Sequence, residues 1–129
     1  MEKEFFEWHQ EKERINAFTK VPFFQEREIW FSSLGANIGS EQDGKGDCFL
    51  RPIVIIRKFN DHTFWAIPLT RALKNDTCHF VFAIDQYGEN AAILSQMRLI
   101  DARRLRYRIA FLSEVDFHLI NEKLKALLP

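Results

Sequence analysis

Two polar side chains lie at the ends of apolar segments that could pair with each other. Arg51 begins RPIVIIRKF (51–59) and Thr70 ends TFWAIPLT (63–70). If the two segments form a hairpin through the intervening turn, Arg51 and Thr70 lie nearly opposite each other. A guanidinium beside a hydroxyl can bind an oxyanion. The spacing alone also allows a purely structural interpretation, in which Arg51 makes a surface ion pair and Thr70 caps its strand.

Motifs for several other chemistries are missing from the sequence. The four histidines are scattered, and none has a second histidine or a cysteine one helical turn away. No GxxxxGK[ST] loop and no GxSxG elbow occurs. We therefore expect no metal and no cofactor, and a catalytic mechanism would have to work without an obvious histidine base.

The segments that would position Arg51 and Thr70 are mostly strands. The β-branched run after Arg51 predicts a strand buried on both faces, and the returning segment contains Pro68, which we expect at an edge or a bulge. Alternating or apolar segments predict further strands at 28–34, 77–85, 91–100 and 105–112. Four glycines predict a long loop between 35 and 50.

A helix is expected at each end of the chain. Apolar residues recur on one face of 2–18, and Pro22 ends that segment. Ser113 precedes Asp116 by three residues, a variant of the capping box, and begins a second helix. Its apolar stripe is Phe117, Ile120, Leu124 and Leu127. The pattern is mainly β (α+β): a small antiparallel barrel with an N-terminal helical extension and a C-terminal helix.

Length and composition limit the classes of protein. A chain of 129 residues with 47% hydrophobic residues predicts one domain with its own core. No signal sequence or apolar run of membrane length occurs, so we expect a cytoplasmic protein with no membrane partner and with Cys48 and Cys78 as free thiols. The net charge of zero argues against nucleic-acid binding through bulk charge alone.

One segment is strongly basic. Residues 98–108 hold five arginines and one aspartate, and such a run is either a solvated face or a basic patch that follows phosphates. Three aromatic residues, Phe49, Trp65 and Tyr87, could stack on bases or belong to the core.

Four blocks together resemble the MazF/PemK toxins of bacterial toxin–antitoxin systems. They are EIWFSSLGANIGSEQDG, RPIVII, IPLT and ILSQMRLIDARRL, in the order of that family, and the resemblance covers about residues 28–128. It divides the chain into an N-terminal helical extension (1–27) and a toxin domain (28–129).

The resemblance implies a homodimeric SH3-like barrel that acts as a metal-independent endoribonuclease. Such an enzyme would cut single-stranded RNA at a short sequence, leave 2′,3′-cyclic phosphate and 5′-hydroxyl ends, and be neutralised by a cognate antitoxin. The resemblance assigns catalysis to Arg51 and Thr70. It assigns RNA binding to Glu41, Gln42, Gln96 and Arg98, with Asp101 in support.

Two departures from the family pattern stand out. The loop before Arg51 is longer than usual, and an Arg-x-Asp pair that some relatives use for acid–base work would fall at Ile93 and Ser95. An alternative function also remains, because related barrels bind a protein target such as DNA gyrase without cutting RNA. A binder of that kind has no need of an Arg51–Thr70 pair.

Overall fold

A computed structural model describes residues 21–34, 50–74 and 76–129 of the chain. The predicted helix at 2–18, the glycine-rich loop and Cys48 lie outside the described residues. The strands are β1 (Glu28–Ser32), β2 (Arg51–Lys58), β3 (Thr63–Thr70), β4 (His79–Ile84), β5 (Gly88–Ile93), β6 (Arg98–Asp101) and β7 (Leu105–Phe111). Two 3₁₀ turns, η4 (Leu94–Gln96) and η5 (Ala102–Arg104), and the helix α2 (Glu114–Ala126) complete the described elements.

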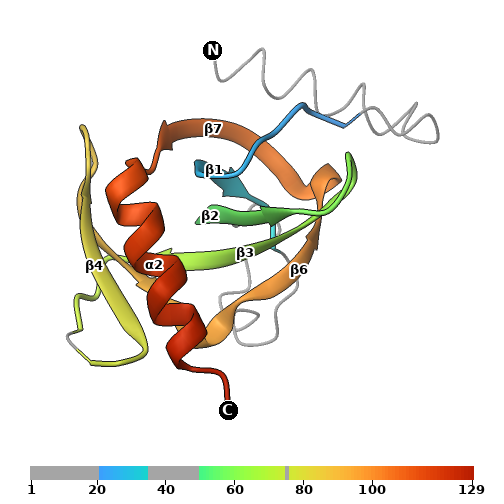
Figure 1. Ribbon diagram of the computed structural model, residues 1–129. Helices are drawn as coiled ribbons and strands as arrows, with labels where there is room; N and C mark the ends of the chain where they lie inside the picture. Colours follow the sequence, from blue (N-terminus) through green and yellow to red (C-terminus); the bar gives the residue numbers. More distant parts are fainter. Residues whose placement is uncertain (1–20, 35–49, 75) are drawn as a thin grey trace, which may run out of the picture.

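The strands form one antiparallel, curved sheet. Its order is β4-β5-β3-β2-β1-β7, and β6 pairs with β3 as well (Figure 1). With α2 against one side, this arrangement confirms the predicted mainly β, barrel-like fold. The hairpin of β2 and β3 matches the predicted segments except that β2 ends at Lys58, one residue early, and it places Ile53 opposite Pro68.

Strand β3 changes partner along its length. Residues Thr63–Ala66 pair with β6, whereas Leu69 and Thr70 pair with β5. Pro68 lies between the residues of β3 that pair with β6 and those that pair with β5. On this edge of β3, its missing N–H therefore costs no backbone hydrogen bond to either strand. The expectation that Pro68 marks an edge strand is wrong, because β3 is interior, and the bulge in this hairpin falls in β2, between Ile55 and Arg57.

The predicted single strand at 91–100 is also wrong. It is divided into the end of β5, the turn η4 and β6. The reason is tertiary: β5 pairs with β4 and the end of β3, whereas β6 pairs with the beginning of β3. The chain has to turn between these positions, and buried Leu94 anchors the turn by donating its N–H to the Cys78 carbonyl at 2.8 Å.

Strand β2 separates two hydrophobic cores, which confirms that it is buried on both faces. Val54 and Ile56 face one core, and Ile53 and Ile55 face the other. The first core also contains Ile29, Ile67, Leu69, Phe82, Ile84, Ala92, Leu94, Leu112 and Ile120. The second contains Phe24, Trp30, Phe64, Ala66, Ile100, Ala102 and Leu105. The alternation of β2 therefore fixes which side chains its ends present to each face.

Helix α2 begins as predicted, because the Ser113 hydroxyl accepts a hydrogen bond from the Asp116 N–H at 3.0 Å. Ile120 is fully buried in the first core, with Phe117 and Leu124 partly buried beside it. Leu127 is 39% exposed, so the predicted stripe ends at the surface. No helix in the described part of the chain is long and apolar enough to cross a membrane.

Candidate oxyanion-binding site

Arg51 and Thr70 meet at one end of the β2–β3 hairpin. Ile53 pairs with Pro68, so the same register carried two residues further brings Arg51 opposite Thr70. Both side chains are partly buried, and both line a cavity of about 340 Å³. Neither is sealed inside hydrocarbon, and the two do not point to different faces of the barrel. The geometry therefore brings a guanidinium and a hydroxyl to one concave surface.

The cavity has apolar walls and a cationic rim. Its walls come from Phe31, Leu50, Pro52, Leu69, Ile84 and Ile109. Arg51, Thr70, Arg71, Tyr87 and Asn90 supply its polar groups. None of the described lining residues is acidic, and two of them, Arg51 and Arg71, carry a guanidinium. This charge distribution favours an anion.

The Thr70 hydroxyl is oriented by the backbone. Its oxygen accepts a hydrogen bond from the Ala72 N–H at 3.1 Å. A hydroxyl that accepts in this way keeps its own proton for donation. Thr70 can therefore present an O–H donor to an anion in the cavity while remaining fixed to the chain.

Arg71 and Tyr87 are held together at the rim. The Arg71 guanidinium donates to the Tyr87 carbonyl at 3.1 Å. Tyr87 lies in the β4–β5 turn, where Gln86 and Gly88 have positive φ angles of 73° and 78°. Tyr87 is 39% exposed. Tyr87 therefore sits where a base could stack on it, whereas Trp65, equally exposed, lines a different hollow and Phe49 lies outside the described residues.

The other predicted RNA-binding residues do not join this cavity. Glu41 and Gln42 lie outside the described residues. Gln96 in η4 and Arg98 at the start of β6 are exposed, and neither lines the cavity. Asp101 instead caps η5, accepting from the Arg103 N–H at 2.8 Å. Hydrogen bonds from the Arg103 side chain hold the pKa of Asp101 below its usual value.

Most of the basic run 98–108 is engaged within the fold. Arg104 donates to the Ser33 carbonyl at 3.0 Å and Arg106 to the Arg103 carbonyl at 2.8 Å. Arg108 lies 3.3 Å from the buried Glu28 carboxylate. The arginines of this run therefore fix the ends of β1 and β7 more than they form a free basic face.

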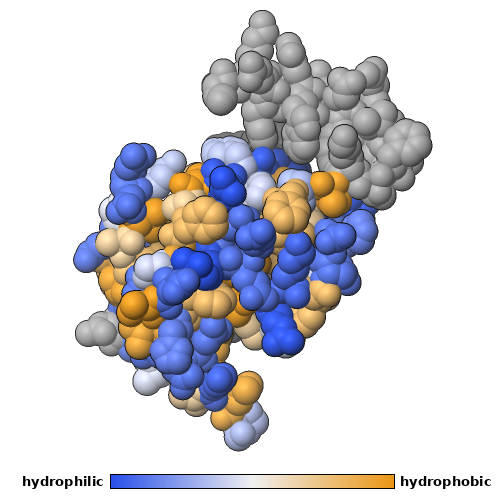
Figure 2. Space-filling view, turned by 45° about the horizontal axis from the view of Figure 1, so that its top comes forward, coloured by the Kyte–Doolittle hydropathy of each residue, from blue (hydrophilic) through white to orange (hydrophobic). Residues whose placement is uncertain are grey.

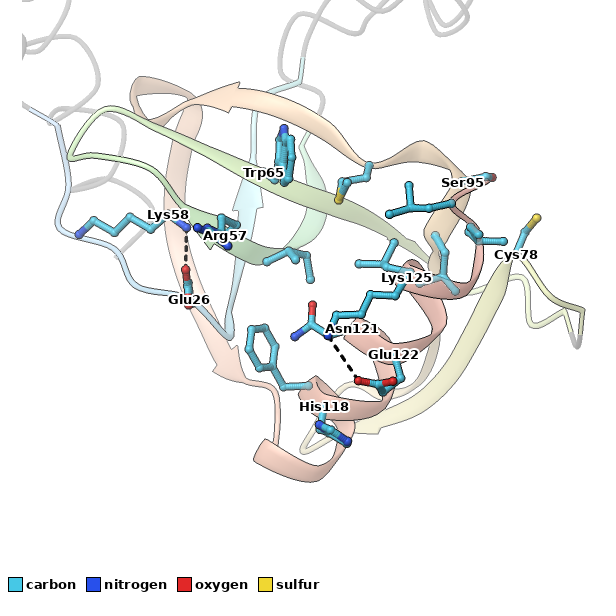
Figure 3. A pocket seen from close by; sticks show the side chains of 17 residues that line it. Glu26, Arg57, Lys58, Trp65, Cys78, Ser95, His118, Asn121, Glu122 and Lys125 are labelled. Atoms are coloured by element: carbon cyan, nitrogen blue, oxygen red, sulfur yellow. Dashed lines mark hydrogen bonds and ion pairs between the residues drawn. The ribbon is translucent and has the colours of Figure 1, made fainter.

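A larger hollow of about 1160 Å³ lies beside α2 (Figure 3). Lys58 and Lys125 line it together with Glu26 and Glu122, so both charge signs are present. Lys125 lies 3.6 Å from Glu122, and the Lys58 ammonium donates to the Phe24 carbonyl at 2.8 Å. Because carboxylates share the surface of this hollow, whereas no acidic residue is among the described residues that line the smaller cavity, the smaller cavity suits an anion better. No cluster of three potential metal ligands occurs among residues 21–34, 50–74 and 76–129.

Comparison with known proteins agrees with this architecture. Residues 25–128 match the model of a family described as PemK-like, MazF-like toxin of type II toxin–antitoxin system. The chain belongs to this family. The resemblance expected from the four sequence blocks is thereby confirmed. No curated protein matches the chain.

Solved structures of MazF toxins share the fold. The Mycobacterium tuberculosis toxin MazF-mt6 aligns with a TM-score of 0.60 at 12% identity, over 78% of this chain and 94% of its own. MazF (form I) from Deinococcus radiodurans aligns with a TM-score of 0.60 at 18% identity, over 83% and 96%. A structure described as an Mtb toxin aligns with a TM-score of 0.55 at 12% identity, over 60% and 92%. At these identities the likeness establishes the PemK/MazF barrel and leaves the site to be argued from its own residues.

Of the residues that line the cavity, sequence reasoning named Arg51 and Thr70, left Tyr87 open between base stacking and the core, and missed Arg71 and Asn90. Arg71 follows Thr70 directly, and its position in the chain alone could have indicated a second cation at the same strand end. Asn90 is the third residue of β5. Its position next to the apolar run AAIL was the available signal that it is buried.

Proposed function

We propose that this PemK/MazF family member is an endoribonuclease that cleaves single-stranded RNA without a metal ion. The observation that carries the proposal is the convergence of Arg51 and Thr70, a guanidinium and a hydroxyl, on one cavity. RNA supplies its own nucleophile, the 2′-hydroxyl next to the scissile phosphate. The enzyme has to position that group and stabilise the charge that develops at phosphorus.

In the proposed reaction the 2′-oxygen attacks phosphorus and the bond from phosphorus to the 5′-oxygen breaks. The products are a 2′,3′-cyclic phosphate and a 5′-hydroxyl. Arg51 stabilises the additional negative charge of the five-coordinate phosphorane, and Thr70 donates its free proton to a non-bridging oxygen. Each donor of this kind contributes about 100- to 1000-fold in rate.

Proton transfer needs a separate group. A guanidinium is a poor general base because it keeps its proton in proteins. Arg51 would instead act as electrostatic stabiliser and as acid to the leaving 5′-oxygen. The 2′-hydroxyl proton would pass to Glu41 as general base. The alternative role for Glu41 is to order the loop that precedes Arg51.

Single-stranded RNA is the proposed substrate because its unpaired bases can be read at their edges. Glu41, Gln42, Gln96 and Arg98 would contact nucleotides that flank the cleaved bond. Gln96 and Arg98 support this assignment by their exposure on η4 and β6.

We further propose a homodimer and an antitoxin that covers the RNA site, in keeping with the toxin–antitoxin family. Large hydrophobic side chains lie at the surface, among them Phe23, Val115 and Leu128, which are 74%, 69% and 70% exposed. Figure 2 shows such hydrophobic areas between hydrophilic side chains on one face of the protein. We propose that exposed apolar side chains such as these take part in the two protein–protein contacts.

The function is tested with a fluorescent RNA strand incubated with the purified protein in excess EDTA. We expect cleavage to persist, and mass spectrometry to find a cyclic phosphate on the upstream product. Replacing the ribose before the cleaved bond by deoxyribose should stop the reaction, since the nucleophile is gone. Loss of activity with EDTA, or cleavage of the deoxyribose substrate, would contradict the mechanism. Intact RNA with a folded protein would favour the protein-binding alternative.

A further inference from the structure

Asn90 is a buried polar residue on the cavity that also contains Arg51 and Thr70. Its side chain is 4% exposed, and it lies in β5 opposite Phe82 of the first core. Three polar or charged residues of the described chain are buried: Glu28, Ser32 and Asn90. Of these, only Asn90 lines the cavity.

The hydrogen bond that Asn90 makes is long. Its side-chain nitrogen donates to the Gly88 carbonyl at 3.4 Å, whereas N–H···O bonds are usually about 2.9–3.0 Å. Since a carbonyl only accepts, the group facing Gly88 is Nδ2. The Oδ1 atom is then the group of Asn90 that can accept from a ligand. The Asn90 side chain makes no other hydrogen bond among the described residues, so this amide keeps hydrogen-bonding capacity for a ligand.

The surroundings of Asn90 match one class of ligand. Apolar walls such as Phe31, Pro52 and Leu69 suit a flat apolar ring, and an amide suits the polar edge of that ring. Arg51, Thr70 and Arg71 at the rim suit a phosphate attached to the same ligand. A nucleotide has this combination of ring, polar edge and phosphate.

We infer that the cavity receives one base of the RNA, with an N–H of that base donating to Asn90 Oδ1 while the adjoining phosphate lies between Arg51 and Arg71. This inference rests on the proposed function and deepens it: Asn90 determines part of the sequence specificity. It forms no bond with the reacting atoms and is therefore a specificity residue.

The variant Asn90→Leu tests the inference, because leucine has nearly the same size and suits a buried site. Asn121→Leu on α2 is the matched control, since Asn121 lines the separate hollow beside the helix. Both variants and the wild type are given a pool of RNA randomised around the cleavage site, and the products are sequenced. Thermal unfolding is recorded for each protein.

We expect Asn90→Leu to keep its unfolding midpoint and to lose about tenfold or more of the preference for one base at one position. Asn121→Leu should keep the wild-type preference. If Asn90→Leu cuts with unchanged preference, or loses rate at all sequences equally, the inference is wrong.

A second measurement does not depend on cleavage or on a mutation. The ¹⁵N-labelled wild type is titrated with the four nucleoside 3′-monophosphates and, separately, with inorganic phosphate, and the Asn90 side-chain amide signals are followed by NMR. We expect at least one nucleotide to shift these signals and phosphate alone to leave them in place. If the wild type cuts no RNA, the proposed function fails, and this titration alone decides the base site. Signals that respond to none of the four nucleotides would overturn it.

Discussion

Arg51, the first residue of β2, and Thr70, the last residue of the antiparallel β3, line the same cavity. The β2–β3 hairpin explains why the two residues lie together. The register that pairs Ile53 with Pro68 places the two strand ends side by side, and the cores on both faces of β2 fix that register. A slip by one residue would move every apolar side chain of β2 to the other face, so the pair is held by the whole strand.

The Thr70 hydroxyl should be needed for its proton. Thr70→Val keeps the shape of the side chain but removes the donor, and we expect RNA cleavage to fall about 100-fold or more. It should also lower the free energy of unfolding by about 1 kcal/mol, because the bond from Ala72 is lost. Rate constants for RNA cleavage and urea unfolding measure the two effects. Thr70→Ser, which keeps the hydroxyl, should retain most of the activity; equal losses in both variants would argue against the donor role.

Ser32 offers a test of the packing next to Arg51. The two residues are cross-strand neighbours in β1 and β2. The Ser32 hydroxyl is fully buried, and it has no hydrogen-bond partner among the described residues. Removing an unpaired buried hydroxyl relieves a desolvation cost, so Ser32→Ala should raise the free energy of unfolding by about 1 kcal/mol. A decrease in the urea midpoint would show that the hydroxyl makes a stabilising contact.

Glu28 should be a structural residue, although it is a buried carboxylate. It accepts from the Trp30 indole at 2.8 Å and from the Gln25 N–H at 3.0 Å, and Arg108 lies at 3.3 Å. Glu28→Ala leaves these donors without their acceptor, and we expect a loss of about 2–4 kcal/mol in the free energy of unfolding.

Arg108→Ala is the comparison for Glu28→Ala. It leaves two of the three hydrogen bonds to Glu28 in place, and the Arg108 side chain is half exposed. It should therefore cost only about 1 kcal/mol. A loss in Arg108→Ala as large as that in Glu28→Ala would contradict this ranking, which chemical denaturation of both variants measures.

Asp101 predicts a pH dependence. The hydrogen bond from the Arg103 side chain lowers the pKa of Asp101 in the folded protein, and the side chain is 39% exposed. Its stabilising effect is therefore present above the unfolded pKa of about 4 and is lost as the pH falls through the lower folded pKa. At this exposure the effect is about 0.5–1 kcal/mol.

The variant Asp101→Asn keeps an acceptor for the Arg103 N–H but removes the charge. We expect it to be less stable than the wild type at pH 7, with the difference shrinking as the pH falls below about 4. Urea midpoints at pH 7 and pH 3 make the comparison. A difference that stays constant or grows towards pH 3 would refute the assignment.

The local parts of the fold could be predicted from the sequence. The hairpin 51–70 was predictable because β-branched runs flank a short turn, and the Ser113 cap because it depends on residues three positions apart. The break at Leu94–Gln96 was not, since it arises from a change of strand partner far along the chain. The apolar run AAIL continues across the boundary and hides it.

In the site, too, the local features could be predicted from the sequence and the long-range ones could not. Arg51 and Thr70 were predictable because one hairpin joins them. Asn90 was not, because its burial depends on β4 and β5 folding over the same cavity. Likewise, the sequence leaves open whether the basic run 98–108 is a solvated face or a patch for phosphates, whereas in the structure Arg104, Arg106 and Arg108 bind groups of the protein.

The most direct test of the central claim compares single-turnover RNA cleavage by the wild type, Arg51→Ala, Arg51→Lys and the control Arg104→Ala. Arg104 is exposed and outside the cavity, so its variant controls for loss of positive charge. We predict that Arg51→Ala lowers the cleavage rate about 1000-fold, and that Arg51→Lys restores only part of it because an ammonium lacks the planar fork. Arg104→Ala should stay within a few-fold of the wild type. Wild-type rates in a folded Arg51→Ala protein would contradict the account.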